Sequence, residues 1–359
     1  MNKIFFEHSV FLNQKVGGIS NYIIKLNQKL NDYKIYSKII SPISINKTLN
    51  NDYSKKINFF KLRKIPKFCR RFFFFINDLF FSIYIKIYKP NLIHFTFYNN
   101  NLLERIKIPY VLTVYDLINE RFNIINNQFN KKNLINNAKH IICISNFTKS
   151  ELIDIYDISP KDISVIHLGV EIKKIETKNN KQNFILFVGD RGRYKNFEKL
   201  IECFGNSEYL KNNFNVICFG GNNFNMEEKE KFEKLKIKKN FFYTSGDNKK
   251  LEEHYKKASL FVSISLMEGF GLTPLEAMSY NCPVVCSDIP VFREILGNSC
   301  EYIDPQDADN LRIKIEKILK SKNEQERLIN LGNKKIAEYP WQKCVEETSK
   351  IYKKILNEK

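Results

Sequence analysis

The sequence predicts an α/β protein of two domains, each built on a parallel sheet. Short apolar runs alternate with segments of helical periodicity along the chain, and this alternation is typical of βαβ units. The 359 residues, 43% apolar and 27% charged, suffice for two domains with substantial cores. Eight of the 13 glycines form four close pairs beside these runs, where open α/β sheets bind ligands. The pairs are Gly17 and Gly18, Gly189 and Gly192, Gly220 and Gly221, and Gly269 and Gly271.

The first half contains four clear apolar runs and three helical segments. We expect strands at 3–6, 91–96, 110–115 and 140–144, and helices at 19–30, 72–88 and 147–156. A polar stretch, KKIETKNNKQ, follows at 173–182. It is the expected linker between an N-terminal domain at 1–172 and a C-terminal domain at 183–338.

The second half repeats the alternation more regularly. Expected strands lie near 184–189, 214–219, 259–264, 283–286 and 300–303, with helices between them. Residues 311–337 are expected to be helical, and Pro340 favours a break before the last helical stretch, within 339–359. We therefore expect a second doubly wound domain and a closing helix.

The charge balance indicates an anionic partner. Lys and Arg number 58 against 39 Asp and Glu, a net charge of +19, which suits nucleic acid, a membrane surface or a phosphorylated metabolite. Residues 55–75 are basic and rich in phenylalanine, and two interpretations stay open. The segment docks on anionic lipid, or it is a surface loop leading into a helix whose phenylalanines fill the core. No nucleic-acid fold motif accompanies it, so we expect no nucleic-acid partner.

Several classes of site and segment are not indicated. The eight cysteines show no C-x-x-C and the five histidines no H-x-x-x-H, so we expect neither disulfides nor a bound metal. Asp307 and Asp309 are better explained by a helix N-terminus than by a metal-bound diphosphate. The N-terminus lacks a signal peptide's apolar region and no 18-residue apolar span follows. We expect a cytoplasmic protein that is soluble or peripheral on the inner face of the membrane.

The strongest local motif is EGFGLTPLEA, which follows a strand expected to end near Ser265. Gly269 and Gly271 let backbone amides approach a ligand, and the helix that Thr273 and Pro274 are expected to open adds partial positive charge. An anion is therefore expected to bind at this turn.

Two glutamates flank that turn, eight positions apart. Glu268 precedes the loop, and no local structural role explains it. Glu276 has two interpretations: it contacts a ligand, or it completes a T-P-L-E capping box with Thr273 as the N-cap.

A second motif, VGDRGRYKNF, is predicted to be a strand, a glycine turn and a helix start. The turn carries Arg191, Arg193 and Lys195. Guanidinium and ammonium groups beside a helix N-terminus suit a diphosphate, because each makes charge-assisted hydrogen bonds to phosphate oxygens. A solvated basic turn is the alternative.

The first half carries two further candidates. Gly17 and Gly18 precede a helix in KVGGISNY, where backbone can approach a phosphate or a sugar. Asp116 follows a strand in YVLTVYDL; it orients a hydroxyl, acts as a base, or caps the next turn.

These motifs, taken in order, resemble the retaining GT-B glycosyltransferases of family 4, also called glycosyl transferases group 1. The resemblance covers nearly the whole chain. It runs through GGISNY, TVYDLINERF, ISNFTKSEL with VIHLGVE, VGDRGRYKNF, and EGFGLTPLEAMSYNCPVVCSDIPVFREI, whose two glutamates match the family's E-x7-E pattern. It implies two Rossmann-like domains, a nucleotide sugar bound mainly by the second, and a last helix after Trp341 that crosses back to the first.

The resemblance also implies roles for individual residues. Arg191 and Lys195 would hold the donor diphosphate, with Arg193 assisting, and Gly18 would lie close to it. Glu268 would contact the transferred sugar, and Glu276 would bind the ribose. The backbone of the loop would approach sugar and phosphate; it comprises Gly269, Phe270, Gly271, Leu272 and Thr273.

The resemblance further implies the partners. The donor would be a nucleoside-diphosphate sugar of the GDP or UDP type, with no cofactor and no metal. The acceptor would be a glycan or a polyprenyl-linked saccharide in bacterial surface-polysaccharide synthesis, and the sugar mannose or a related hexose.

One position departs from the family. Many relatives have His-Asp where this chain has Tyr115 and Asp116, and tyrosine is a poorer base near neutral pH. Two alternatives to transfer stay open: a sugar-nucleotide epimerase on the same fold, or a non-enzymatic protein that binds membrane or nucleic acid through the basic segment.

Overall fold

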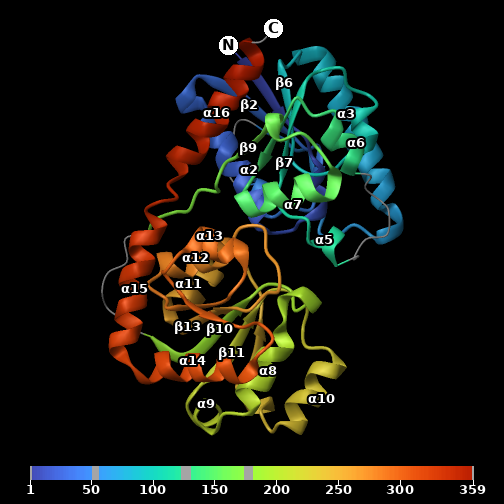
Figure 1. Ribbon diagram of the computed structural model, residues 1–359. Helices are drawn as coiled ribbons and strands as arrows, with labels where there is room; N and C mark the ends of the chain where they lie inside the picture. The colour runs from blue at the N-terminus through green and yellow to red at the C-terminus, as the bar shows by residue number, and fades with distance from the viewer. Residues whose placement is uncertain (1, 51–55, 123–130, 174–180, 358–359) are drawn as a thin grey trace. The chain divides into compact units, whose positions relative to one another are not determined.

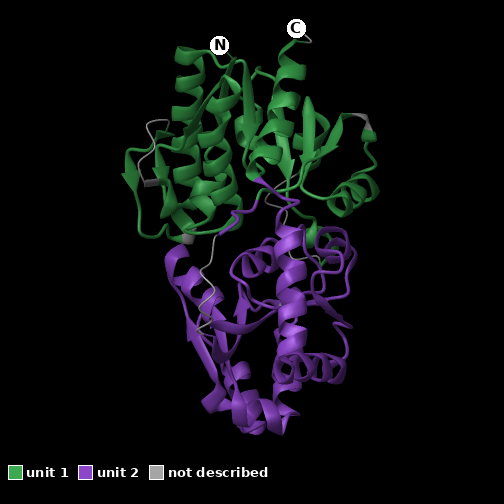
Figure 2. Ribbon diagram, turned by 90° about the vertical axis from the view of Figure 1, so that its left-hand side faces the viewer, with its two compact units in different colours: residues 1–169, 341–359 green, residues 170–340 purple. Residues whose placement is uncertain are grey.

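The computed structural model describes residues 2–50, 56–122, 131–173 and 181–357. The chain forms two compact units, shown in different colours in Figure 2. Unit 1 contains Met1–Gly169 and Trp341–Lys359, and unit 2 contains Val170–Pro340. The chain thus leaves unit 1 after Gly169 and returns to it at Trp341, where α16 begins. Of the stretch expected as a linker, 174–180 lie outside the described residues.

Unit 1 is built on a parallel sheet of order β4-β2-β1-β6-β7-β8-β9. All side chains of β6, β7 and β8 are buried, as expected for strands covered on both faces. The strands are β1 (Asn2–Phe6), β2 (Ile35–Ile40), β4 (Lys56–Ile57), β6 (Leu92–Phe95), β7 (Tyr110–Val114), β8 (His140–Cys143) and β9 (Ile163–Val165), with β3 (Ile43–Ser44) and β5 (Phe60–Lys61) paired separately. The helices are α1 (Ser9–Asn13), α2 (Gly18–Lys29), α3 (Arg70–Tyr88), α4 (Asn100–Leu103), α5 (Ile118–Arg121), α6 (Lys131–Asn136), α7 (Asn146–Tyr156) and α16 (Trp341–Asn357).

Unit 2 has a parallel sheet of order β12-β11-β10-β13-β14-β15. Since β10 is first in the chain, this is the doubly wound order 3-2-1-4-5-6, and its topological switch point lies between β10 and β13. The strands are β10 (Gln182–Val188), β11 (Asn215–Phe219), β12 (Phe241–Thr244), β13 (Ala258–Ser263), β14 (Val284–Ser287) and β15 (Glu301–Ile303). The helices are α8 (Phe197–Gly205), α9 (Glu208–Asn213), α10 (Met226–Lys234), α11 (Asn248–Lys257), α12 (Leu272–Ser279), α13 (Pro290–Leu296), α14 (Ala308–Lys320) and α15 (Lys322–Ile336). Figure 1 labels most of these elements.

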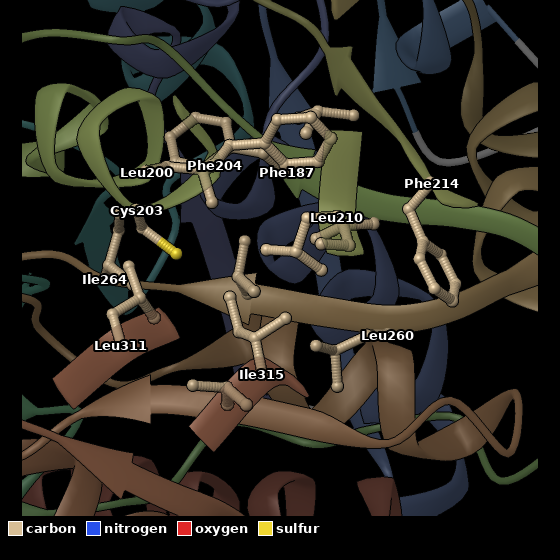
Figure 3. Packing of buried hydrophobic residues seen from close by; sticks show 14 of the residues in the cluster. Phe187, Leu200, Cys203, Phe204, Leu210, Phe214, Leu260, Ile264, Leu311 and Ile315 are labelled. Atoms are coloured by element: carbon tan, nitrogen blue, oxygen red, sulfur yellow. The ribbon is translucent and has the colours of Figure 1, made fainter. Parts of the chain in front are cut away.

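The core of unit 2 fixes β10 and β13 against two helices. Phe187 of β10 and Leu260 of β13 belong to one buried cluster with Leu200 and Phe204 of α8 and Ile315 of α14 (Figure 3). None of these five side chains is more than 2% exposed. Burying such side chains contributes about 1.5–3 kcal/mol each, so the two strands that border the switch point are held firmly.

The last helix, α16, packs into unit 1. Tyr352 hydrogen-bonds His94 Nδ1, and Thr113 Oγ1 lies 2.7 Å from His94 Nε2. The indole of Trp341 stacks on Tyr22, with 6.1 Å between ring centroids. Complete burial lowers the pKa of His94 to about 3, which keeps the imidazole neutral.

Several element boundaries differ from expectation. Residues 311–337 form two helices, because Ser321 ends α14 and caps α15 by accepting the amide of Glu324. The prediction for Asp307 is confirmed, since its side chain accepts the first amides of α14. Strands β2, β9 and β12 were not expected.

Candidate functional site

Two loops leave the sheet of unit 2 at its switch point. One follows β10 and spans 189–196, and the other follows β13 and spans 264–271. Because Phe187 of β10 pairs with Val262 of β13 in a parallel register, both loops leave the carboxyl edge side by side. This is the edge at which doubly wound sheets bind ligands.

Lys195 of the first loop contacts Glu268 of the second. The distance from Lys195 Nζ to Glu268 Oε1 is 2.5 Å, and Ser265 Oγ donates to the same oxygen at 2.6 Å. The two charged side chains are 16% and 17% exposed. The structure therefore brings together the basic turn and the acidic loop singled out in the sequence, and leaves both side chains partly accessible.

The backbone of the first loop holds Lys195 in place. Arg193–Lys195 form a short 3-10 turn, η5, in which the Lys195 amide donates to Gly192 O at 2.8 Å. The Leu266 amide donates to Tyr194 O at 2.7 Å, which ties this loop to the one after β13. The side chain of Arg193 lies outside the described part of the chain.

Arg191, which the sequence predicts as a diphosphate contact, is paired with acceptors of unit 2. Its Nε donates to Glu228 Oε1 at 2.7 Å, and its Nη2 donates to Asn222 O at 2.6 Å. The guanidinium lies 4.9 Å from the ring centre of Phe224, and its side chain is only 6% exposed. Glu228, Asn222 and the aromatic ring hold the guanidinium and anchor the loop after β10. Its Nη1 is buried and has no hydrogen-bond partner in the described part of the chain, so one donor is left for a ligand.

The second loop ends at the start of α12, two residues earlier than expected. Gly271 is the N-cap, with a φ of +107° that side-chain-bearing residues rarely adopt. An added Cβ would also come within 3.1 Å of Phe292. Gly269, Phe270 and Gly271 therefore precede the helix, and Leu272 and Thr273 are its first two residues.

The capping-box interpretation of Glu276 is wrong. Since Gly271 is the N-cap, Thr273 lies inside the helix and makes no cap. Glu276 Oε2 instead accepts a hydrogen bond from the Tyr255 hydroxyl at 3.2 Å. Burial, followed by the charge of Glu276, holds the pKa of Tyr255 well above its usual value, so the hydroxyl stays a donor.

The candidates in the first half of the chain belong to unit 1. Gly18 is the first residue of α2, with Gly17 as its N-cap. Asp116 Oδ1 accepts the amide of Ile118 at 3.2 Å, which confirms its turn-capping interpretation. Tyr115 is buried, and its hydroxyl has no hydrogen-bond partner in the described part of the chain. Burial holds the pKa of that hydroxyl well above its usual value, so Tyr115 cannot act as a base near neutral pH.

Sequence reasoning missed a buried polar cluster at the switch point of unit 1, between β1 and β6. Glu7 accepts the amides of Ser9, Thr96 and Phe97 at 2.6, 2.8 and 3.0 Å. His8 Nε2 lies 2.9 Å from Asp78 Oδ1. The dipeptide Glu7-His8 directly after a strand was the available signal, but apart from the Ser9 amide the partners named here lie 70 or more positions away.

Neither a metal centre nor a membrane-spanning helix occurs among the described residues. They contain no group of three or more His, Cys, Asp or Glu side chains arranged to hold a metal ion. Nor does any helix in those segments combine the length and apolarity needed to cross a membrane.

Comparisons with known proteins follow the same division of the chain. The family described as glycosyl transferases group 1 matches residues 170–335, and glycosyltransferase family 4 matches 16–174. The O-antigen chain mannosyltransferase RfbU of Salmonella typhimurium is 32% identical over 53% of this chain and 54% of its own length. An uncharacterized glycosyltransferase of Methanocaldococcus jannaschii, MJ1178, is 24% identical over 71% of each chain. The match thus spans about half the length of the first relative.

Solved structures share the architecture over the whole chain. Sucrose-phosphate synthase from Thermosynechococcus elongatus superposes with a TM-score of 0.79 at 17% identity, covering 100% of both chains. The glycosyltransferase WaaG, described as involved in lipopolysaccharide biosynthesis, gives 0.74 at 13% identity, covering 97% of this chain and 99% of its own.

Proposed function

The chain belongs to the glycosyl transferases group 1 and has the GT-B fold, and from this premise we propose that it is a retaining, metal-independent hexosyltransferase of surface-polysaccharide synthesis. The donor is a nucleoside-diphosphate sugar of the GDP or UDP type. The acceptor is a glycan or a polyprenyl-linked saccharide. Mannose or a related hexose is the proposed sugar, because RfbU and a second relative, from Escherichia coli, are named O-antigen chain mannosyltransferases.

The ion pair between Lys195 and Glu268 carries this proposal. It places one cation and one carboxylate, both partly exposed, at the switch point of the sheet. A diphosphate sugar needs a cation for its phosphates and an acceptor for its sugar hydroxyls, and this pair offers one of each. On donor binding, Lys195 exchanges the carboxylate for a phosphate oxygen, and Glu268 accepts from the sugar.

Stabilisation of the leaving group is the main chemical demand. As the bond from the anomeric carbon to the diphosphate oxygen breaks, negative charge grows on that oxygen and the sugar becomes oxocarbenium-like. Lys195 and the amides at the start of α12 neutralise this charge, and the positive end of the helix dipole adds to the effect. The acceptor oxygen attacks from the same face and passes its proton to the departing phosphate. No separate protein base is then needed.

The remaining residues have supporting roles. Glu276 binds the ribose hydroxyls, oriented by its bond from Tyr255. Arg191 positions the loop that carries Lys195, through Glu228. Gly18 and Asp116 of unit 1 remain proposed substrate contacts. We propose that the enzyme acts on the cytoplasmic face of the membrane, where a polyprenyl-linked acceptor is accessible.

Nucleotide screening tests the proposal. Thermal shifts are measured with GDP, UDP, ADP and their sugars, since a ligand at free concentration L stabilises the folded state by RT ln(1 + L/Kd), which grows as L exceeds Kd. We expect one nucleotide family to stabilise the wild type and to stabilise the Lys195→Ala variant much less. A protein that none of these ligands stabilises would contradict the assignment. Transfer with donor plus acceptor, against donor alone, separates a transferase from an epimerase.

A further inference from the structure

Helix α3 carries a second apolar face that points away from the core of unit 1. Asn77, Asp78, Phe81 and Ile85 line its buried side. The opposite side carries five large apolar residues at intervals of three or four positions, which fall on one line along a helix. They are Phe72, Phe75, Leu79, Ile83 and Ile87, with exposures of 60, 51, 44, 43 and 65%.

The segment before α3 extends this apolar face. Phe59, Phe60 and Phe68 are 57, 66 and 87% exposed. The ring of Phe59 packs edge-on against Phe80 of α3, with 6.3 Å between centroids, so the segment and the helix form one continuous patch. We call these three phenylalanines and the five residues of the stripe the α3 surface. It lies on unit 1, where Figure 1 labels α3.

The interpretation of the basic segment as a loop leading into a core-packed helix is only partly confirmed. Phe81 fills the core, as the loop-and-helix interpretation expects. Phe72 and Phe75 are exposed, whereas that interpretation expects them to fill the core. Exposure of a patch of this size in a monomeric protein usually marks an interaction surface.

Charge identifies the partner. Lys61, Arg63, Lys64, Arg70 and Arg71 are all exposed beside the phenylalanines. Asp78 is the only acid from 56 to 88, and it is 1% exposed and bonded to His8 and Asn99. No carboxylate in this stretch therefore faces outward. A second copy of the chain would bring two strongly basic faces together, whereas an anionic surface is complementary.

We propose that the α3 surface docks on an anionic phospholipid bilayer, with α3 lying in the plane of the interface. Its 19 residues give a length of about 28 Å, enough for the stripe to contact lipid along several turns. The phenylalanines enter the boundary between headgroups and acyl chains, and the cations contact lipid phosphates. Docking would place unit 1 at the membrane without any helix crossing it.

Vesicle flotation of the full chain tests this. The probes are vesicles of phosphatidylcholine alone and of phosphatidylcholine with 30 mol% phosphatidylglycerol. We expect binding to the anionic vesicles only, weakened by salt. The variant Phe72→Ser/Phe75→Ser/Leu79→Ser should bind at least tenfold less. Replacing Arg63, Lys64 and Arg71 with glutamine should weaken binding to the anionic vesicles about fivefold for each cation removed.

A matched variant controls for general loss of exposed apolar side chains. Met226, Phe242 and Ile313 of unit 2 are 70, 50 and 54% exposed, and their replacement by serine should leave flotation unchanged. Nucleotide-induced thermal shifts should be equal in all variants, which separates this proposal from the proposed activity. Equal binding to neutral vesicles, equal loss in the control variant, or self-association through α3 without vesicle binding would overturn it.

Discussion

The ammonium of Lys195 lies 2.5 Å from the carboxylate of Glu268, although 73 positions separate the two residues in the chain. The parallel pairing of β10 with β13 produces this proximity, because both loops leave the same edge of the sheet. Unit 2 thus presents a cation, a carboxylate and the start of α12 at its switch point. The account of catalysis depends on these three features.

Lys195→Ala should lower sugar transfer roughly 10²–10³-fold, because the leaving diphosphate loses its cation. Steady-state transfer with a radiolabelled donor measures this, and circular dichroism checks the fold. Lys199→Ala is the matched control, since Lys199 pairs with Glu202 on α8 and should be replaceable with little change. Undiminished turnover in a folded Lys195→Ala protein would remove Lys195 from the mechanism.

Glu276→Gln should weaken nucleotide affinity with little change in melting temperature, because the amide oxygen can still accept from the buried Tyr255 hydroxyl. Thr273→Ala should change the free energy of unfolding by less than about 0.5 kcal/mol, because Thr273 is not an N-cap. A true N-cap threonine would cost roughly 0.5–2 kcal/mol. Calorimetric titration with the nucleotide and urea unfolding distinguish the two effects. A large stability loss in Thr273→Ala would restore the capping box.

Arg191→Ala should destabilise the fold by about 3–5 kcal/mol, since the largely buried Glu228 carboxylate loses its ion-pair partner and keeps only the hydrogen bond from the Asn225 amide. Arg191→Ala/Glu228→Ala should be less destabilised than the sum of the single variants. Urea unfolding of all four proteins gives the coupling energy. Additive losses, or a stable Arg191→Ala protein that fails only to bind nucleotide, would favour direct contact with the diphosphate.

We predict that the free energy of unfolding depends on pH through His94. Burial lowers its pKa to about 3 in the folded chain, against about 6.5 when unfolded, so the unfolded state binds the proton more readily between these values. The contribution is fully present above pH 6.5 and is lost as the pH falls toward 3. From pH 8 to 5 the loss is about 2 kcal/mol. Between pH 8 and pH 5, the urea midpoint of the wild type should fall further than that of His94→Asn. Equal falls in the two proteins would contradict the prediction.

Local motifs predicted the fold class and much of unit 2. The glycine turn with Lys195 and the loop with Glu268 each follow an apolar strand, so both could be found from short stretches of sequence. Strands β2, β9 and β12 were missed, and length alone does not explain this, since β2 has six residues and the expected β15 has three.

Long-range contacts explain the errors at the site. The basic turn gave no sign that Arg191 pairs with Glu228, 37 positions later, although this pairing does not test its predicted contact with a diphosphate. T-P-L-E matches a capping box, yet Gly271 adopts a φ of +107° against Phe292 and starts the helix earlier. The side-chain partner of His8 and the Thr96 and Phe97 amides that Glu7 accepts lie 70 or more positions away. Such pairings depend on the tertiary fold, which spacing alone does not give.

A crystal structure with a bound nucleoside-diphosphate sugar tests the central claim most directly. We predict that Lys195 Nζ and the first amides of α12 contact phosphate oxygens, while Glu268 has left Lys195 and accepts from a sugar hydroxyl. A donor seated at the switch point with its phosphates beyond hydrogen-bond distance of Lys195, and the ion pair intact, would contradict the account.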